Sequence, residues 1–141
     1  MKQYTGTKVV NATLMTREAY NNFRGWQVPA DENPLDDGYL VEYTDGGQAN
    51  TDSYDGYVSW SPKDVFEKSY LPSEHPIDRM IIENSQLLEK LKVLDKLLDG
   101  DKPEKISDKQ WRLLKGQHAH MTGYFNTLDE RIEDMAAQAD L

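Results

Sequence analysis

Two stretches in the second half of the chain carry apolar residues at alternating spacings of four and three, the period of one helix face. The first stretch has this spacing at Met80, Asn84, Leu87, Leu91, Leu94 and Leu98. The second has it at Trp111, Leu114, His118, Met121, Phe125, Leu128, Ile132 and Met135. Gly100 and Pro103 separate the stretches, and Ser107 resembles the cap of the second one. The sequence therefore predicts helices over about 76–99 and 108–136, which so short a connection folds into an antiparallel hairpin.

A hairpin of two helices buries one seam, so its second apolar flank needs another partner. That partner is either the protein's own N-terminal domain or another copy of the hairpin, which would give a homo-oligomer with a four-helix interface. For His118, the sequence leaves open a seam position, a ligand role or a pH-sensing role. The candidate residues of an oligomer or partner interface are Ile81, Leu88, Leu113 and His118.

The first 72 residues hold most of the aromatic side chains and mix strand and helix periods. The predicted order is strand, helix, strand, strand, helix, over residues 4–15, 17–23, 38–44, 57–60 and from 61 onward. Thr16 is the expected cap of the first helix and Ser61 of the second, while Gly25 ends the first. The fold class is therefore α+β: a small N-terminal β-sheet with short helices in residues 1–72, then the helical hairpin in residues 73–141.

Aromatic residues are expected to fill the core of this first domain, because a domain so small needs large side chains to bury enough area. Trp26 is expected in the core beside the first helix. The inward-facing residues expected on the second helix are Val65, Phe66 and Tyr70. The residues of the strand over 38–44 alternate in polarity, which predicts that one of its faces is better buried than the other.

The net charge of −9 argues against a nucleic-acid binder, because contacts to phosphates need clustered Lys and Arg. Residues 1–72 hold 6 basic and 11 acidic side chains and residues 73–141 hold 10 and 14, so no basic arm is hidden. No apolar stretch approaches the roughly 20 residues that cross a bilayer, so no membrane contact is expected and the cytoplasm is the default location. Without cysteine there is no thiolate nucleophile, disulfide or zinc-thiolate site.

The residue types that carry catalysis or bind metals are not grouped in the sequence. His118 and His120 are two residues apart on a helix, which turns their rings to different sides and disfavours a shared metal ion. The clustered acids fall in a loop or at a helix end, where no apolar pocket would separate their pKa values. Gly46 and Gly47 lack the lysine and helix of a phosphate loop and predict a turn. The chain is therefore expected to be no enzyme and to use no cofactor or metal.

The aromatic and basic residues of the first domain suggest a binding hypothesis. A nucleotide base would stack on a tyrosine or tryptophan, and its phosphates would seek arginine, lysine or the start of the second helix. The candidate ligand-binding residues are Lys8, Arg17, Arg24, Trp26, Tyr57, Trp60 and Ser61. A small core needs the same aromatic residues, so packing is the competing interpretation.

Several blocks of the first half resemble an N-terminal module of phage and prophage proteins. They include Arg24-Gly25-Trp26, Gly38-Tyr39-Leu40-Val41-Glu42-Tyr43 and Gly56-Tyr57-Val58-Ser59-Trp60-Ser61-Pro62-Lys63-Asp64-Val65-Phe66-Glu67. Similar modules stand ahead of a domain of the Thoeris anti-defence 2 family, phage proteins that sequester nucleotide signals of bacterial immunity. The resemblance implies a counter-defence role in the cytoplasm of the host cell. The glycine- and tryptophan-rich domain of that family is absent here, so no ligand-binding residue is carried over from it.

The hairpin is similar to a short helical family named from crAss-like phages, on Leu88-Glu89-Lys90-Leu91 and Leu128-Asp129-Glu130-Arg131-Ile132. Together, the resemblances imply a non-enzymatic phage accessory protein that binds and sequesters a nucleotide-derived immune signal as a homo-oligomer. The alternative is an inhibitor that binds a host defence protein through the acidic helical hairpin. An enzyme is the third hypothesis, and no grouping of catalytic residues supports it.

Overall fold

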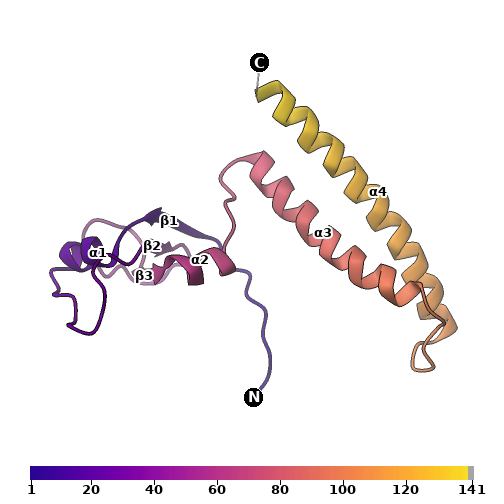
Figure 1. The fold of residues 1–141 in the computed structure, drawn as a ribbon, viewed down its shortest axis with the longest axis horizontal. Coiled ribbons are helices and arrows are strands. Elements are labelled where there is room, and N and C mark those ends of the chain that lie inside the picture. Colours follow the sequence, from indigo (N-terminus) through magenta and orange to yellow (C-terminus); the bar gives the residue numbers. More distant parts are fainter. Residues whose placement is uncertain (140–141) are drawn as a thin grey trace. The chain divides into compact units, whose positions relative to one another are not determined.

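The computed structural model describes residues 1–139 and divides the chain into two compact units. The first unit runs from Met1 to Leu71, and the second begins at Pro72. Figure 1 shows a small sheet with two short helices in the first unit and two long helices in the second.

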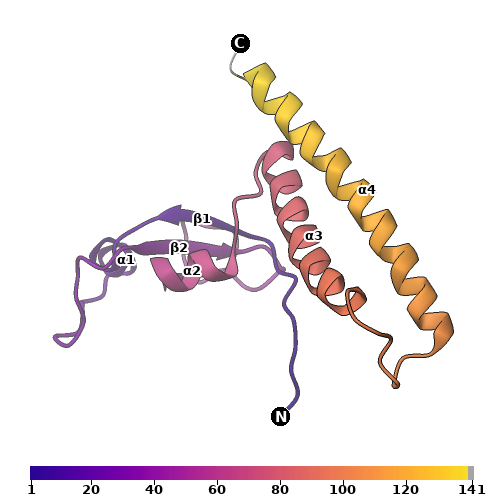
Figure 2. The ribbon, with the colours of Figure 1, turned by 45° about the vertical axis from the view of Figure 1, so that its right-hand side comes forward.

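The first unit contains a three-stranded antiparallel sheet and two helices. In chain order its elements are β1 (Val10–Leu14), α1 (Arg17–Arg24), β2 (Gly38–Tyr43), β3 (Val58–Pro62) and α2 (Lys63–Ser69). The strand order is β1-β2-β3, so β2 lies in the middle and pairs with both neighbours (Figure 2). The predicted order of strand, helix, strand, strand, helix is confirmed.

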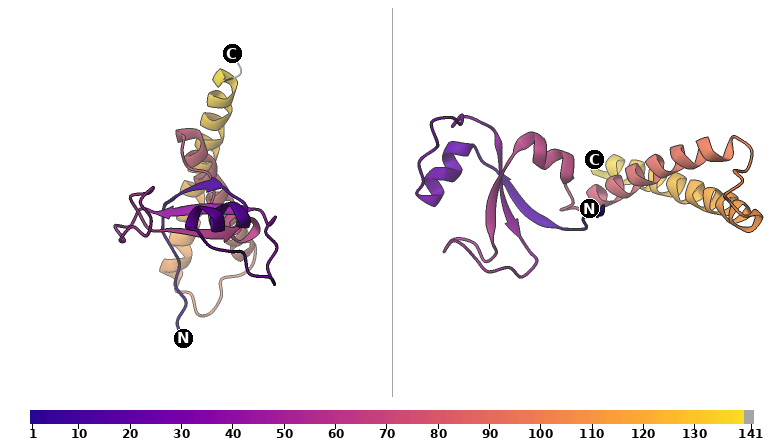
Figure 3. Two further views of the ribbon diagram at one scale, coloured as in Figure 1. Left: turned by 90° about the vertical axis from the view of Figure 1, so that its left-hand side faces the viewer. Right: turned by 90° about the horizontal axis from the view of Figure 1, so that it is seen from below.

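The central strand β2 is buried on both of its faces. Leu40 and Val41 point to opposite faces of the sheet, and each is 2% exposed. Leu40 packs into a cluster with Tyr20 of α1, whereas Tyr39 stacks on Phe66 of α2 with ring centroids 4.2 Å apart. Figure 3 (right) shows α1 and α2 on opposite sides of the sheet. Each face of β2 is covered by a helix of its own, and the buried core cluster lies on the Leu40 face.

Two apolar residues expected inside the first unit lie on its surface. Trp26 is 51% exposed, and Val65 is exposed as well. Gly25 adopts a left-handed conformation, with φ of 72°, and turns the chain back so that the Trp26 N–H donates to the Asn21 carbonyl at 2.8 Å. This turn holds the indole outside the core. Phe66 and Tyr70 are half-buried and stack on each other, as predicted for the inner side of α2.

The two helix starts of the first unit differ. The Thr16 hydroxyl accepts a hydrogen bond from the Ala19 N–H at 3.2 Å, which confirms it as the cap of α1. Ser61 is not the cap of α2, because it belongs to β3 and its hydroxyl donates to the Pro62 carbonyl at 3.4 Å. The cap position is Pro62, and the Lys63 N–H donates to the Asp37 carbonyl instead.

The second unit is the predicted helical hairpin of α3 (Pro76–Leu98) and α4 (Asp108–Ala139), which run antiparallel (Figures 1 and 2). The seam pattern is confirmed. Buried in it are Met80, Asn84, Leu91, Leu94 and Leu128. The remaining predicted seam residues are half-buried: Leu87, Leu98, Trp111, Leu114, His118, Met121, Phe125, Ile132 and Met135. The Ser107 hydroxyl caps α4 by accepting from the Gln110 N–H at 3.1 Å.

Candidate functional site

Two of the basic residues predicted to bind a ligand are paired with acids of the first unit. The Lys8 ammonium lies 2.9 Å from an Asp45 carboxylate oxygen and over the Tyr43 ring. This bond to Asp45 raises the pKa of Lys8 and, with a backbone hydrogen bond, lowers that of Asp45. The Arg17 guanidinium bonds to Glu32 at 3.0 Å and reaches Asp36 at 3.4 Å. The charge of both cations is thus largely compensated inside the unit.

Arg24 and Trp26 form a separate surface pair. The guanidinium carbon of Arg24 lies 4.3 Å from the centroid of the Trp26 ring, and Arg24 donates to the Tyr20 hydroxyl at 2.9 Å. Among residues 1–139, no carboxylate lies within 4 Å of the Arg24 side-chain nitrogens. A half-buried cation over an exposed indole can hold an anion or an aromatic ring weakly.

The other predicted ligand-binding residues belong to different contacts. The Trp60 indole N–H donates to the Met15 carbonyl at 2.7 Å, and Arg17 covers its ring at 4.4 Å. Tyr57 packs beside Tyr43, with ring centroids 6.2 Å apart. The seven predicted residues therefore do not form one cluster. Lys8 and Tyr57 both lie beside Tyr43, Arg17 lies over Trp60, Arg24 lies over Trp26, and Ser61 belongs to β3.

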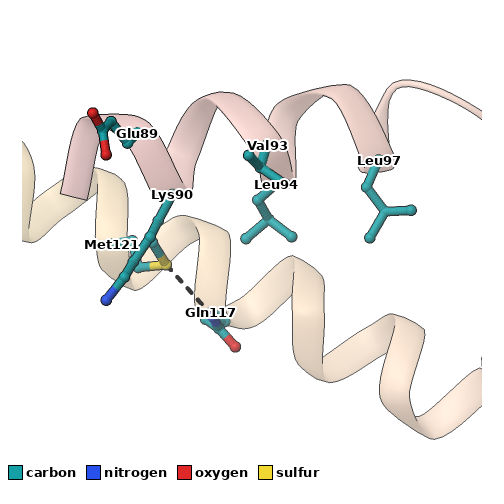
Figure 4. A pocket seen from close by; sticks show the side chains of 7 residues that line it. All are labelled: Glu89, Lys90, Val93, Leu94, Leu97, Gln117 and Met121. Carbon is teal, nitrogen blue, oxygen red and sulfur yellow. Dashed lines mark hydrogen bonds between the residues drawn. The ribbon is translucent and has the colours of Figure 1, made fainter. Parts of the chain in front are cut away.

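The hairpin carries an apolar groove of about 360 Å³ between α3 and α4. Figure 4 shows Leu94 and Leu97 pointing from α3 toward α4, with Lys90 reaching across beside Met121. Its lining residues are Glu89, Lys90, Val93, Leu94, Leu97, Gln117 and Met121. Val93 is 72% exposed, so the groove presents apolar surface to solvent.

A second and more polar groove of about 720 Å³ lies on the other flank of the hairpin. Its lining residues are Lys92, Asp95, Lys96, Leu98, Asp99 and His118. The His118 Nε2–H donates to Asp95 Oδ1 and ties α4 to α3 at this point. Lys92 and Lys96 are one helical turn apart, and their stripe on α3 is distinct from that of Lys90, Val93 and Leu97.

The structure divides the four predicted interface residues between the two flanks. Leu113 lies one turn before Gln117, on the side of the apolar groove. His118 lines the polar groove, and Leu88 lies one turn before Lys92 on that same side. Ile81 lies two turns before Leu88. All three leucine and isoleucine side chains are exposed, so each flank keeps some uncovered apolar surface.

Polar bonds between the helices fix the hairpin away from its connection. The Tyr124 hydroxyl donates to a Glu83 carboxylate oxygen, which raises the pKa of Tyr124. Asn84 donates to Asp129 across 3.4 Å within the seam. Both pairs join residues more than 40 positions apart in sequence, so they specify how the two helices align.

The part of the chain that the structure describes shows neither a metal-binding group of side chains nor a membrane-spanning helix. No group of three or more His, Asp or Glu side chains there is placed to hold a metal ion. No helix within residues 1–139 combines the length and apolarity needed to cross a membrane.

Comparison with known families found a match within the second unit. Residues 74–134 match the model of the Sequestin family. Over these residues, which are fewer than half of the chain, the hairpin is similar to the Sequestin family. No curated protein and no solved structure matched the chain. The matched segment contains both grooves and all four predicted interface residues, but none of the seven predicted ligand-binding residues.

Apart from His118, the residues that line the two grooves were not predicted as a site. Lys92 and Lys96 are exposed lysines on a helix, a pattern that solvated helix surfaces share. The one sequence feature that could have indicated them is their spacing of four residues beside an apolar seam, because this spacing places both lysines on one side of α3. Sequence alone does not show that α4 brings His118 to the same place.

Proposed function

We propose that the protein binds a small nucleotide-derived immune signal and withholds it without converting it, as a counter-defence protein of phage or prophage origin. The match of the hairpin to the Sequestin family carries this proposal, because the family name denotes sequestration. The resemblance of the N-terminal half to modules of phage anti-defence proteins supports the same conclusion. Phage origin and the nucleotide nature of the signal rest on that resemblance.

The dimensions of the grooves fit such a ligand. Small-molecule sites in proteins span roughly 300–1,000 Å³. The two grooves of the hairpin, at about 360 and 720 Å³, fall within this range. Each is open at the surface of a two-helix unit, so a second protein surface would be needed to enclose a ligand fully.

We further propose that another copy of the hairpin covers the flank of the apolar groove. Val93, Leu113 and Tyr124 are exposed on the flank of the apolar groove and would be buried by such a partner. Residues 89–115, around the connection, hold 8 basic and 6 acidic side chains, whereas residues 73–88 and 116–141 hold 2 and 8. Antiparallel association of two hairpins would place the acidic end of one beside the basic end of the other.

Titration calorimetry of the intact protein with cyclic di-AMP, cyclic di-GMP and cyclic ADP-ribose isomers tests the binding claim. The proposal predicts saturable heat with at least one of them. Light scattering after size-exclusion chromatography tests the oligomer, with a dimer or larger species expected. No heat with any nucleotide would contradict sequestration of this class of signal, and a monomer at all concentrations would contradict self-association.

A host protein is the second candidate ligand, favoured by the acidic end of the hairpin. Acids outnumber basic residues there by 8 to 2, and four of them, interrupted by Arg131, cluster on the last part of α4 at Asp129, Glu130, Glu133 and Asp134. Such a surface suits a basic partner protein. Saturable binding of a basic defence protein by the intact chain, together with no nucleotide binding, would favour this function over the first.

A further inference from the structure

We infer that the polar groove of the hairpin is an anion-binding site, in which Lys92 and Lys96 hold the phosphate groups of the sequestered nucleotide and His118 engages the carboxylate of Asp95 beside them. The inference rests on the proposed function and adds to it the place and the ligand chemistry. It moves the phosphate site from the first unit, where the sequence predicted it, to the hairpin segment that is similar to the Sequestin family.

The two lysines of the groove are available to an incoming anion. Within residues 1–139, no carboxylate oxygen lies within 4 Å of the side-chain nitrogen of Lys92 or Lys96. Asp95 stands between them in sequence, but its carboxylate is engaged by His118. The ammonium groups, one turn apart on α3, can therefore converge on one phosphate or on two neighbouring ones.

His118 is held in place by the same contact. Its ring is half-buried, and the bond from Nε2 to Asp95 leaves Nδ1 for a different partner. An imidazole that gives its Nε2–H to Asp95 keeps this carboxylate engaged and away from the anion that the lysines bind.

The local charge of the hairpin favours an anion at this end. Residues 89–115 carry an excess of two basic side chains, although the whole chain has a net charge of −9. Asp99 also lines the groove and reduces the attraction. Without the two lysines, the acidic residues of the groove would repel an anion. Removal of both lysines is therefore expected to abolish most of the affinity.

An aromatic ring lies on the same side of α4. Trp111 precedes His118 by two helical turns, which places both on one stripe of the helix. Trp111 is half-buried, and the Lys115 ammonium lies 5.6 Å from the centroid of its ring. A planar base could stack on the open part of the indole while its phosphates reach the lysines. The ligand class is therefore a phosphate-bearing nucleotide, rather than inorganic phosphate alone.

The competing location is the first unit. Lys8 and Arg17 are both bound to carboxylates there, so an anion would have to displace an existing ion pair. Arg24 is the exception, with its guanidinium over Trp26. The test must therefore compare the polar groove with Arg24 directly.

Calorimetry with the cyclic nucleotide that binds the intact protein most tightly tests the site on full-length variants. Lys92→Gln with Lys96→Gln is expected to weaken binding by roughly tenfold to a hundredfold. Lys105→Gln with Lys109→Gln changes the net charge equally, lies outside the groove and is expected to change affinity by less than about threefold. Trp111→Phe should weaken the nucleotide but leave the weaker binding of inorganic pyrophosphate unchanged. Unchanged circular dichroism would establish that each variant is folded.

The possible results separate the two proposals. Undiminished binding by the Lys92, Lys96 double variant, or loss of binding only in Arg24→Gln, would overturn this site while leaving sequestration intact. An equal loss in both double variants would reduce the effect to net charge and would also overturn it. Absence of binding by the intact protein would overturn the site and the proposed function together.

Discussion

Asn84 lies in the seam of the hairpin, 8% exposed, and donates from Nδ2 to Asp129 Oδ1 across 3.4 Å. Its own Oδ1 is buried and has no hydrogen-bond partner among residues 1–139. A buried polar group left unpaired destabilises a protein, whereas a polar residue in a helical seam specifies register. Asn84 therefore favours one alignment of the two helices at some cost in stability.

Asn84→Leu is expected to raise the free energy of unfolding of the hairpin by roughly 1 kcal/mol, because it replaces an unsatisfied amide with an apolar side chain. Urea denaturation followed by circular dichroism measures this change. Asp129→Asn, which retains an acceptor for Nδ2 outside the seam, serves as the control and should change stability little. A lower free energy of unfolding for Asn84→Leu would contradict the prediction, because it would show that the Asn84 amide stabilises the hairpin.

Two glycines give opposite predictions in the two units. A Cβ on Gly38 would lie 2.4 Å from the Ser61 carbonyl oxygen and from the Trp60 ring, so Gly38→Ala should destabilise the first unit by roughly 1–3 kcal/mol. A Cβ on Gly123 of α4 would meet no atom within 4 Å apart from its chain neighbours and the backbone of its own helix, so Gly123→Ala should stabilise the hairpin by roughly 0.5–1 kcal/mol. Chemical denaturation of each variant measures both changes. The prediction fails if Gly38→Ala is tolerated without loss.

Tyr39 and Tyr124 should ionise later than the other tyrosines in an alkaline titration. Each phenol donates to a carboxylate, Glu67 or Glu83, and this bond, aided by burial and by the negative charge, raises its pKa. Because the folded-state pKa is raised, the stabilisation is complete below a pH of about 10 and is lost as the pH rises through the folded value.

The ultraviolet absorbance of tyrosinate follows this titration. Glu83→Gln should shift one late-titrating tyrosine of the eight back toward its ordinary range, since the neutral amide no longer opposes phenolate formation. Glu89→Gln is the matched control, because it removes the same charge from an exposed position of α3. Equal titration curves for all three proteins would contradict the assigned contact.

Val93→Glu should break the proposed association of two hairpins. The substitution would place a carboxylate in an apolar interface and is expected to weaken association by about tenfold or more. Val65→Glu makes the same change at an exposed valine of α2, in the first unit, and should leave the oligomer unchanged. Light scattering over a range of protein concentrations measures both variants, and dissociation of both alike would contradict an interface at Val93.

Local sequence patterns predicted most of the fold. The Thr16 cap, the Gly25 stop and the seam of alternating spacings each depend on a few neighbouring residues, so the printed sequence contains the whole signal. Trp26 was misplaced because its exposure depends on the turn that Gly25 makes. The second buried face of β2 depends on α2 folding over Tyr39, a contact between elements that alternation within one strand does not report.

The candidate site was less predictable than the fold. Aromatic and basic residues in the first half suggested a nucleotide site. In the structure, however, Lys8 and Arg17 pair with carboxylates that are distant in the sequence. Lys92 and Lys96 looked like ordinary solvated lysines, and only the antiparallel alignment of α4 brings His118 between them and the seam. Such convergence of side chains from two helices depends on tertiary structure and has no local signature.

Recovery of a bound nucleotide is the measurement that most directly tests sequestration without conversion. Intact protein would be incubated with each cyclic nucleotide, filtered to remove unbound ligand and denatured by heat, and the released compound would be identified by chromatography and mass spectrometry. The account predicts that one nucleotide is retained in a fixed ratio to the protein and is released chemically unchanged. Retention of none of them, or release of a cleaved product, would contradict it.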